Sequence, residues 1–177
     1  MLAAYKRLAE AGFEGLRTRD VAAEVGVNIA TLHYYFPTKE ALIRGAVGHA
    51  MERFRTTFEP GSKPGEQLAA QLHGVRRLAA NEPELFVVMG ELALRSGRDP
   101  AIAAIFKEMV DAWHATLRTL VRHAQSDGFV DKKLDPDTIA SLVIATLTGL
   151  FMVPVPSADR QRVDRAIGQL ERFLGLR

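Results

Sequence analysis

Apolar residues recur every three or four positions along most of this chain, which is the spacing of one face of an α-helix. The longest such series is Ile102, Ile105, Phe106, Met109, Val110, Trp113, Leu117, Leu120, Val121 and Ala124. Valine and isoleucine nowhere form an alternating pattern between two turns, so we expect no β-strand. The pattern therefore predicts an all-α protein.

Capping and helix-breaking residues mark the ends of these helices. A first helix is expected over residues 1–11, with Gly12 as its stop, and a fourth from Lys39 to about Phe58 after the cap Thr38. The segment Glu59–Gly65, with its two Pro-Gly pairs, is typical of a linker. Four or five helices follow, with expected boundaries at Pro83, Asp99-Pro100, Asp127-Gly128, Asp135-Pro136 and Ser157 or Asp159.

The second and third helices form the most informative segment, Thr18–Lys39. Ala22 is small enough for a second helix to cross closely, and Gly26 can adopt the left-handed conformation that ends a helix in one residue. Asn28 is placed to cap the next helix. Two helices joined by a short glycine turn form the DNA-binding helix-turn-helix, although an ordinary helical hairpin has the same spacing.

Two further features concern this corner. Its apolar contacts are expected to come from Val21, Val25, Val27 and Leu32. The second helix of the motif, which is the third of the chain, ends in surface aromatics followed by a lysine, in the sequence HYYFPTK. Surface aromatics and a lysine next to a helix N-terminus suit phosphate contacts better than a protein core, which favours DNA binding.

Residues 2–47 resemble the DNA-binding domain of the TetR family of bacterial transcriptional repressors. The matching residues are Gly12-Phe13, Thr18, Ala22, Gly26-Val27, Thr31-Leu32, Tyr35-Phe36, Lys39 and Leu42. His33 stands where the family usually has tyrosine, and its imidazole can donate to a phosphate or a base. The resemblance implies an N-terminal three-helix helix-turn-helix domain, at 1–47, and a larger C-terminal helical dimerisation and ligand-binding domain, at 48–177.

The resemblance and the motif together predict the DNA-contacting residues. They are Thr18, Arg19, Asn28, Ile29, Ala30, Thr31, His33, Tyr34, Tyr35 and Lys39. The alternative to DNA contact for Arg17 and Arg19 is that they are a pair of solvated surface charges. Ile29 and Ala30 are apolar and suit thymine methyl groups better than guanine hydrogen bonds.

The helix over residues 138–151 is apolar or small on every side. A helix of this kind is buried all round, which in a domain of this size indicates a contact with another chain, or else a central core helix. The resembling family dimerises through its last two long helices. The predicted dimer interface comprises Leu142, Ala145, Thr146, Gly149, Ile167 and Leu170.

A stripe of methionine and aromatic residues has two interpretations. It consists of Phe86, Met89, Met109, Trp113 and Leu117. At helical spacing such residues most often form core, but they also line adaptable apolar pockets. Because the resembling family binds small, often hydrophobic inducers between these helices, we predict a ligand site here, with His114, Thr116 or Thr146 as polar contacts.

Composition narrows the function classes further. The net charge is +2, and the surplus lies in residues 1–58, with eight Lys or Arg against six Asp or Glu. The chain has no cysteine and no nucleotide-binding or hydrolase motif, and His49 with Glu52 is an isolated pair of metal-type ligands. We therefore expect no enzyme activity, no metal, no cofactor and no membrane span, and a cytoplasmic location.

The sequence predicts a ligand-responsive repressor that binds palindromic operator DNA as a homodimer. The alternative is a small-molecule-binding or interaction protein of the same fold whose DNA binding is weak or lost. That alternative draws on the start of this chain within the first helix, whereas the family usually has a basic arm upstream.

Overall fold

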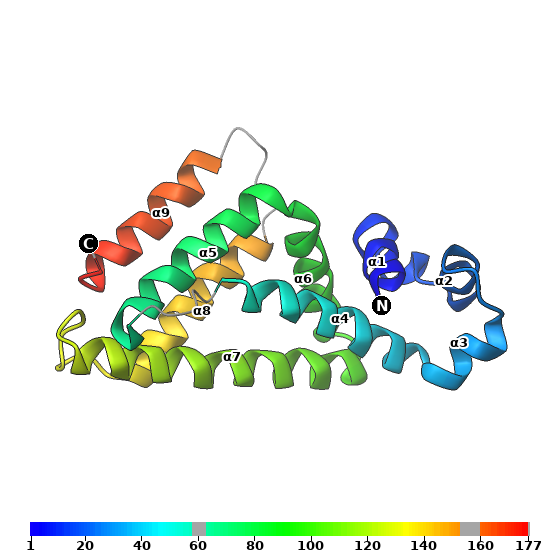
Figure 1. The fold of residues 1–177 in the computed structure, drawn as a ribbon, viewed down its shortest axis with the longest axis horizontal. Helices are drawn as coiled ribbons and strands as arrows, with labels where there is room; N and C mark the ends of the chain where they lie inside the picture. The colour runs from blue at the N-terminus through cyan, green and yellow to red at the C-terminus, as the bar shows by residue number, and fades with distance from the viewer. Residues whose placement is uncertain (58–62, 153–159, 177) are drawn as a thin grey trace.

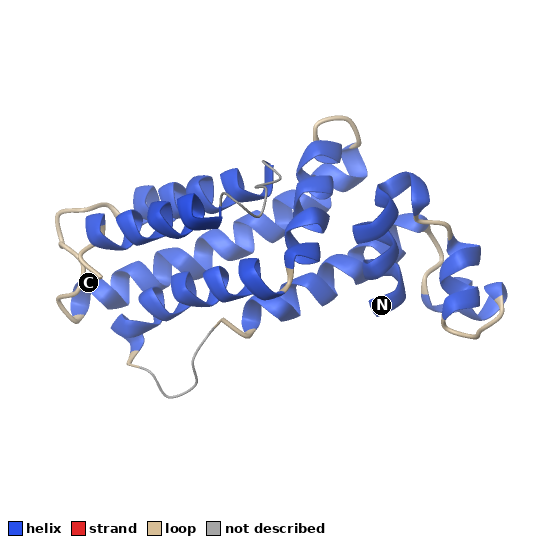
Figure 2. Cartoon of the chain, turned by 90° about the horizontal axis from the view of Figure 1, so that it is seen from above, coloured by secondary structure: helices blue, strands red, loops and turns tan. Residues whose placement is uncertain are grey.

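The computed structural model describes residues 1–57, 63–152 and 160–176, and within them every regular element is helical (Figures 1 and 2). The predicted all-α class is confirmed for this part of the chain. The elements are α1 Leu2–Gly15, α2 Thr18–Glu24, α3 Ile29–Tyr35, α4 Lys39–Arg55, the 3-10 turn η1 Pro64–Glu66, α5 Gln67–Asn81, α6 Pro83–Ser96, α7 Pro100–Ser126, α8 Pro136–Met152 and α9 Arg160–Phe173.

The predicted caps are confirmed by side-chain hydrogen bonds. The Asn28 carboxamide oxygen accepts from the Thr31 backbone N–H at 2.7 Å, and the Thr38 hydroxyl accepts from Ala41 at 3.1 Å. Asp99 accepts from the first turn of α7, at 3.1 and 3.3 Å. Each cap satisfies backbone donors that have no partner inside their own helix.

Two predicted helix ends differ from the structure for local reasons. The first helix does stop at Gly12, whose φ is +61°, but the chain resumes one helical turn that carries α1 to Gly15. The fourth ends at Arg55 rather than Phe58, because the hydroxyls of Thr56 and Thr57 donate to the carbonyls of Arg53 and Phe54.

Two predicted segments lie partly outside the described residues. They are residues 59–62 of the expected linker, and Ser157 or Asp159 as the opening of the last helix. Of the remaining linker residues, Gly65 donates its backbone N–H to the Asp127 carboxylate at 2.9 Å. This bond holds the start of α5 against the end of α7.

The buried side chains form two clusters along the length of the molecule. The first contains the cores of α1 to α4 together with α6 and the first turns of α7. The second contains α5, the rest of α7, α8 and α9, and Phe54 and Phe86 pack against both clusters. Figure 1 shows α1 to α3 gathered at one end, with α6 between them and the helices of the second cluster.

The predicted boundary after residue 47 falls within α4, which runs unbroken through it. It stays a prediction, and we refer to residues 1–47, which the sequence predicts to bind DNA, as the DNA-binding unit. Because this unit shares its buried cluster with α6 and α7, a displacement of α6 changes contacts that reach α1.

We expect two glycine-to-alanine substitutions to have opposite effects on stability. A Cβ on Gly74, in α5, would lie 2.7 Å from the Thr57 Cα, so Gly74→Ala should lower the free energy of unfolding by about 1–3 kcal/mol. A Cβ on the exposed Gly48, in α4, meets nothing within 4 Å, so Gly48→Ala should raise it by about 0.5–1 kcal/mol. Urea unfolding measures both values, and a Gly74→Ala protein as stable as Gly48→Ala would contradict the packing of α5 on the end of α4.

Candidate functional site

The helix-turn-helix is built from α2 and α3 around a small apolar contact. Val21, Ala22 and Leu32 are buried between the helices, and Gly26 turns the chain with φ +69°. Val25 and Val27, predicted to lie inside this corner, are exposed instead. The turn is so short that only one side of each helix faces the other.

The corner leaves the outer side of α3 open to solvent. Ile29, Ala30 and His33 are exposed, as are Tyr34 at 81% and Tyr35 at 68% of their surface. The two tyrosine rings meet edge to face, with centroids 5.2 Å apart. Large aromatics this exposed contribute little to the core of one chain, so they are available to a partner.

The remaining predicted DNA contacts are more tied to the protein. Thr18 and Thr31 are half-buried, while Arg19 is exposed at the start of α2. The Asn28 carboxamide oxygen also accepts from the Thr31 hydroxyl, at 3.0 Å. The hydrogen bonds between Asn28 and Thr31 therefore fix the start of α3, and any DNA contact by either side chain uses the polar atoms that these bonds leave free.

Lys39 is held by the protein itself. Its ammonium donates to the Phe13 carbonyl at 2.8 Å, across from the first turn of α4 to the last turn of α1. An ammonium group has three donors, so two remain for a phosphate. Sequence spacing gave no sign of this bond, because its partners lie 26 residues apart.

Two of the predicted ligand residues, Phe86 and Trp113, take part in an aromatic contact between the two buried clusters. The Phe54 ring stacks on Trp113 with centroids 6.2 Å apart and meets the Phe86 ring edge-on at 6.3 Å. We call Phe54, Phe86 and Trp113 the aromatic cluster. Phe54 was not among the predicted ligand residues, because its position on α4 indicated only core.

The other predicted ligand residues differ in their access. Met89 and Leu117 are fully buried, in different clusters, whereas Met109 is half-buried. The three polar candidates already have partners in the protein. Thr116 and Thr146 donate to carbonyls of their own helices, and the His114 Nε2 lies 3.1 Å from the Ser141 hydroxyl.

Two ion pairs tie α4 to α6 and α7. Arg44 binds Glu108 of α7 at 2.6 Å, and Arg53 donates to Glu82, at the start of α6, with its Nε at 2.7 Å. The hydrogen bonds from Arg53 hold the pKa of the Glu82 carboxyl below its ordinary value. Burial, and then the charge of Glu82, raises the pKa of Tyr5 to about 12.

The predicted interface residues on α8 are exposed or half-buried, whereas one of those on α9 is fully buried in its own chain. Leu142 is 53% exposed, and Ala145 and Gly149 lie on the same open side, with Thr146 half-buried. Ile167, by contrast, is fully buried in its own chain, and Leu170 is half-buried against the same cluster. The choice of Ile167 as an interface residue was therefore wrong, because the apolar side of α9 covers α5.

The described residues contain neither a metal site nor a membrane-spanning helix. No three His, Asp or Glu side chains there are grouped so that they could hold a metal ion. His49, half of the isolated metal-type pair, packs its ring on Tyr5 at 5.0 Å, and Glu52 pairs with Arg55. No described helix combines the length and the apolar character needed to cross a membrane.

Comparison with protein families decides between the possible identities of this helix-turn-helix fold. Residues 1–46 match the model of the tetR family of bacterial regulatory proteins, and residues 64–176 match that of the C-terminal part of BetI-type transcriptional repressors. The chain belongs to the TetR family. TetR-family proteins are DNA-binding transcription regulators, and enzymatic activity is not general among them.

Individual relatives of this TetR-family protein are distant but cover almost all of it. The HTH-type transcriptional regulator PksA of Bacillus subtilis is 24% identical in an alignment of 178 positions that covers 94% of this chain and 83% of PksA. A TetR-family transcriptional regulator from Rhodococcus sp. has the same fold, with a TM-score of 0.83 at 24% identity over 98% of this chain and 95% of that chain. So does a transcriptional regulator from Saccharomonospora viridis in complex with choline, with a TM-score of 0.72 at 24% identity over 97% and 91%.

Proposed function

We propose that this protein is a ligand-responsive repressor that binds a palindromic operator as a homodimer and leaves it when a small apolar or amphipathic molecule binds. The observation that carries the proposal is the exposed side of α3, on a unit whose buried core continues into α6. Two copies related by a two-fold axis would place their α3 helices in half-sites roughly 34–36 Å apart. A ligand acts on this arrangement only through its different affinities for the bound and released conformations.

Selection from random double-stranded DNA tests this function directly. We expect enrichment of a palindrome, and a shift assay should then show much weaker binding to scrambled DNA of the same length and composition. Failure to enrich any sequence would favour the alternative, a small-molecule-binding or interaction protein of the same fold that has lost DNA binding.

We predict that Lys39 contacts a phosphate with the donors that Phe13 leaves free. The first turn of α4 has free backbone N–H groups and the positive end of the helix dipole, both of which favour an anion. Lys39→Ala should weaken binding to all sequences alike and lower the slope of log affinity against log salt by about one. Lys132→Ala, in the turn before α8, is the control and should leave the slope unchanged. If Lys39→Ala lowers only the melting temperature, the lysine serves α1 and not DNA.

The aromatic cluster is the proposed centre of the effector site. It joins the cluster containing the DNA-binding unit to the cluster containing α8 and α9, so a molecule wedged there would displace both. Stacked aromatic rings accept apolar groups, and they also attract quaternary ammonium ions by cation–π interaction. Choline is therefore one compound to test, alongside neutral apolar compounds.

Trp113 provides the measurement for this site because it is the only tryptophan in the chain. A molecule that releases the operator should change its fluorescence, and Trp113→Ala should weaken that molecule's binding about tenfold or more. The control is Phe106→Ala, a half-buried aromatic of α7 outside the aromatic cluster. Normal effector binding to Trp113→Ala would place the effector site elsewhere.

A further inference from the structure

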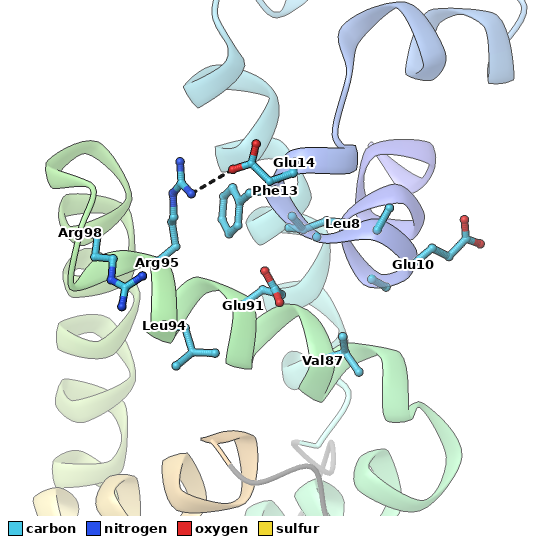
Figure 3. Close-up of a pocket in the computed structure, with 12 residues that line it drawn as sticks. Leu8, Glu10, Phe13, Glu14, Val87, Glu91, Leu94, Arg95 and Arg98 are labelled. Carbon is cyan, nitrogen blue, oxygen red and sulfur yellow. Dashed lines mark hydrogen bonds and ion pairs between the residues drawn. The ribbon is translucent and has the colours of Figure 1, made fainter.

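A groove separates the last turns of α1 from the outer side of α6, and no residue of the aromatic cluster lines it (Figure 3). Its volume is about 680 Å³, within the range of sites that bind small molecules. One wall is residues 8–14 of α1, and the other is Val87, Glu91, Leu94 and Arg95 of α6, with Arg98 just beyond. We call it the α1–α6 groove.

The centre of the groove contains a carboxylate that lacks a partner. Glu91 is half-buried, and no side chain or backbone donor among the described residues pairs with it. Figure 3 shows it pointing from α6 toward α1, where a Cβ on Gly12 would lie 3.0 Å from its Oε2. Of the two acids on the α1 wall, Glu14 is already paired with Arg95 at 3.1 Å, and Glu10 is exposed. A half-buried carboxylate left alone is costly, so a cation bound beside it gains more than it would on open surface.

The surroundings of Glu91 define the rest of the ligand. Val87 and Leu94, four residues before it and three after it, are 49% and 62% exposed. The Phe13 ring lies on the opposite wall, with the Arg95 guanidinium 5.8 Å from its centroid. Arg98, the remaining cation of the lining, is exposed and solvated at the end of the groove, so a ligand anion would gain less there than an ammonium at Glu91. The groove thus offers one half-buried, unpaired carboxylate flanked by aliphatic surface.

We propose that the α1–α6 groove is a second ligand site, for a small organic ammonium ion with an apolar body. Its ammonium N–H groups donate to the Glu91 carboxylate, and its hydrocarbon part covers Val87 and Leu94. Because the groove has one wall from α1, in the DNA-binding unit, and the other from α6, an ion bound in it lies between the two helices and biases their spacing. This effect on DNA rests on the proposed repressor function, whereas binding itself does not.

The probe is 2-phenylethylammonium, titrated calorimetrically into the full chain without DNA. Glu91→Gln should weaken its binding about tenfold to a hundredfold, because the charge-assisted hydrogen bond is lost. Leu94→Ser, at an exposed position that tolerates the change, should weaken it by a smaller factor. Two control variants should keep the affinity for 2-phenylethylammonium within about twofold of the unaltered protein. They are Glu10→Gln, at the edge of the groove, and Trp113→Ala, in the aromatic cluster.

Two comparison compounds, one neutral and one a quaternary ammonium ion, separate the contribution of the charge from that of the N–H donors. 2-Phenylethanol lacks the charge, so its affinity should be the same for Glu91→Gln and the unaltered protein. Choline keeps the charge but lacks the N–H donors, so Glu91→Gln should weaken its binding by a smaller factor than that of 2-phenylethylammonium. Equal affinity of the primary ammonium for Glu91→Gln and the unaltered protein would overturn the site, and so would loss of binding in Trp113→Ala. Operator affinity is measured separately, so a protein that binds the ammonium but no DNA retains the site and loses only the repressor function.

Discussion

Replacing Ala145 with glutamate is expected to convert the proposed homodimer into monomers and to weaken operator binding by about a hundredfold. Ala145 lies beside Leu142 and Gly149 on the open side of α8, where the protein leaves apolar surface uncovered. A carboxylate placed there would be buried without a partner when two copies associate, which costs several kcal/mol. A monomer holds one half-site at a time and loses the gain from linking the two contacts.

Sedimentation velocity measures the first effect and a shift assay the second. Ala115→Glu is the matched control, since it places the same charge at an exposed alanine of α7. It should leave both the dimer and the operator affinity unchanged. If the Ala145→Glu protein sediments as an intact dimer, the two copies meet through another surface.

The features that sequence analysis predicted well depend on neighbours in the chain. The caps at Asn28, Thr38 and Asp99 join atoms two or three residues apart, and Gly26 and Gly128 take their left-handed conformations for reasons local to one turn. Such interactions are encoded by residue type and spacing alone. The all-α class follows from the same kind of information, because helical periodicity needs no knowledge of distant contacts.

The features it missed depend on which helices meet. An apolar stripe on α9 looks the same whether it covers its own chain or a partner, so only the packing of α9 on α5 shows that Ile167 is unavailable. The bond from Lys39 to Phe13 and the pairing of Arg53 with Glu82 join elements that are far apart in sequence. The position of the unpartnered Glu91 likewise depends on α1 and α6 lying side by side. Val25 and Val27 were misplaced for a related reason, since an apolar residue in a tight turn has no guaranteed inner side.

Removing both Tyr34 and Tyr35 from α3 is expected to reduce operator affinity about a hundredfold, or about tenfold for each tyrosine. Each phenol hydroxyl can donate to a phosphate oxygen, and hydrogen bonds to charged groups are worth about 1.5–3 kcal/mol. At 81% and 68% exposure, the two rings contribute little to folding, so the Tyr34→Ala and Tyr35→Ala proteins should melt at nearly the same temperature as the unaltered protein.

Phenylalanine substitutions separate the hydroxyl from the ring. Tyr34→Phe and Tyr35→Phe should reproduce most of the loss if phosphate contacts dominate, and little of it if the rings pack against sugars or bases. Phe129→Ala, an exposed aromatic in the turn after α7, is the control and should bind operator normally. Because phosphate contacts carry no sequence information, the loss should be similar for operator and non-specific DNA. A double alanine variant whose operator affinity stays within about threefold of the unaltered protein would contradict a role for this end of α3 at the DNA backbone.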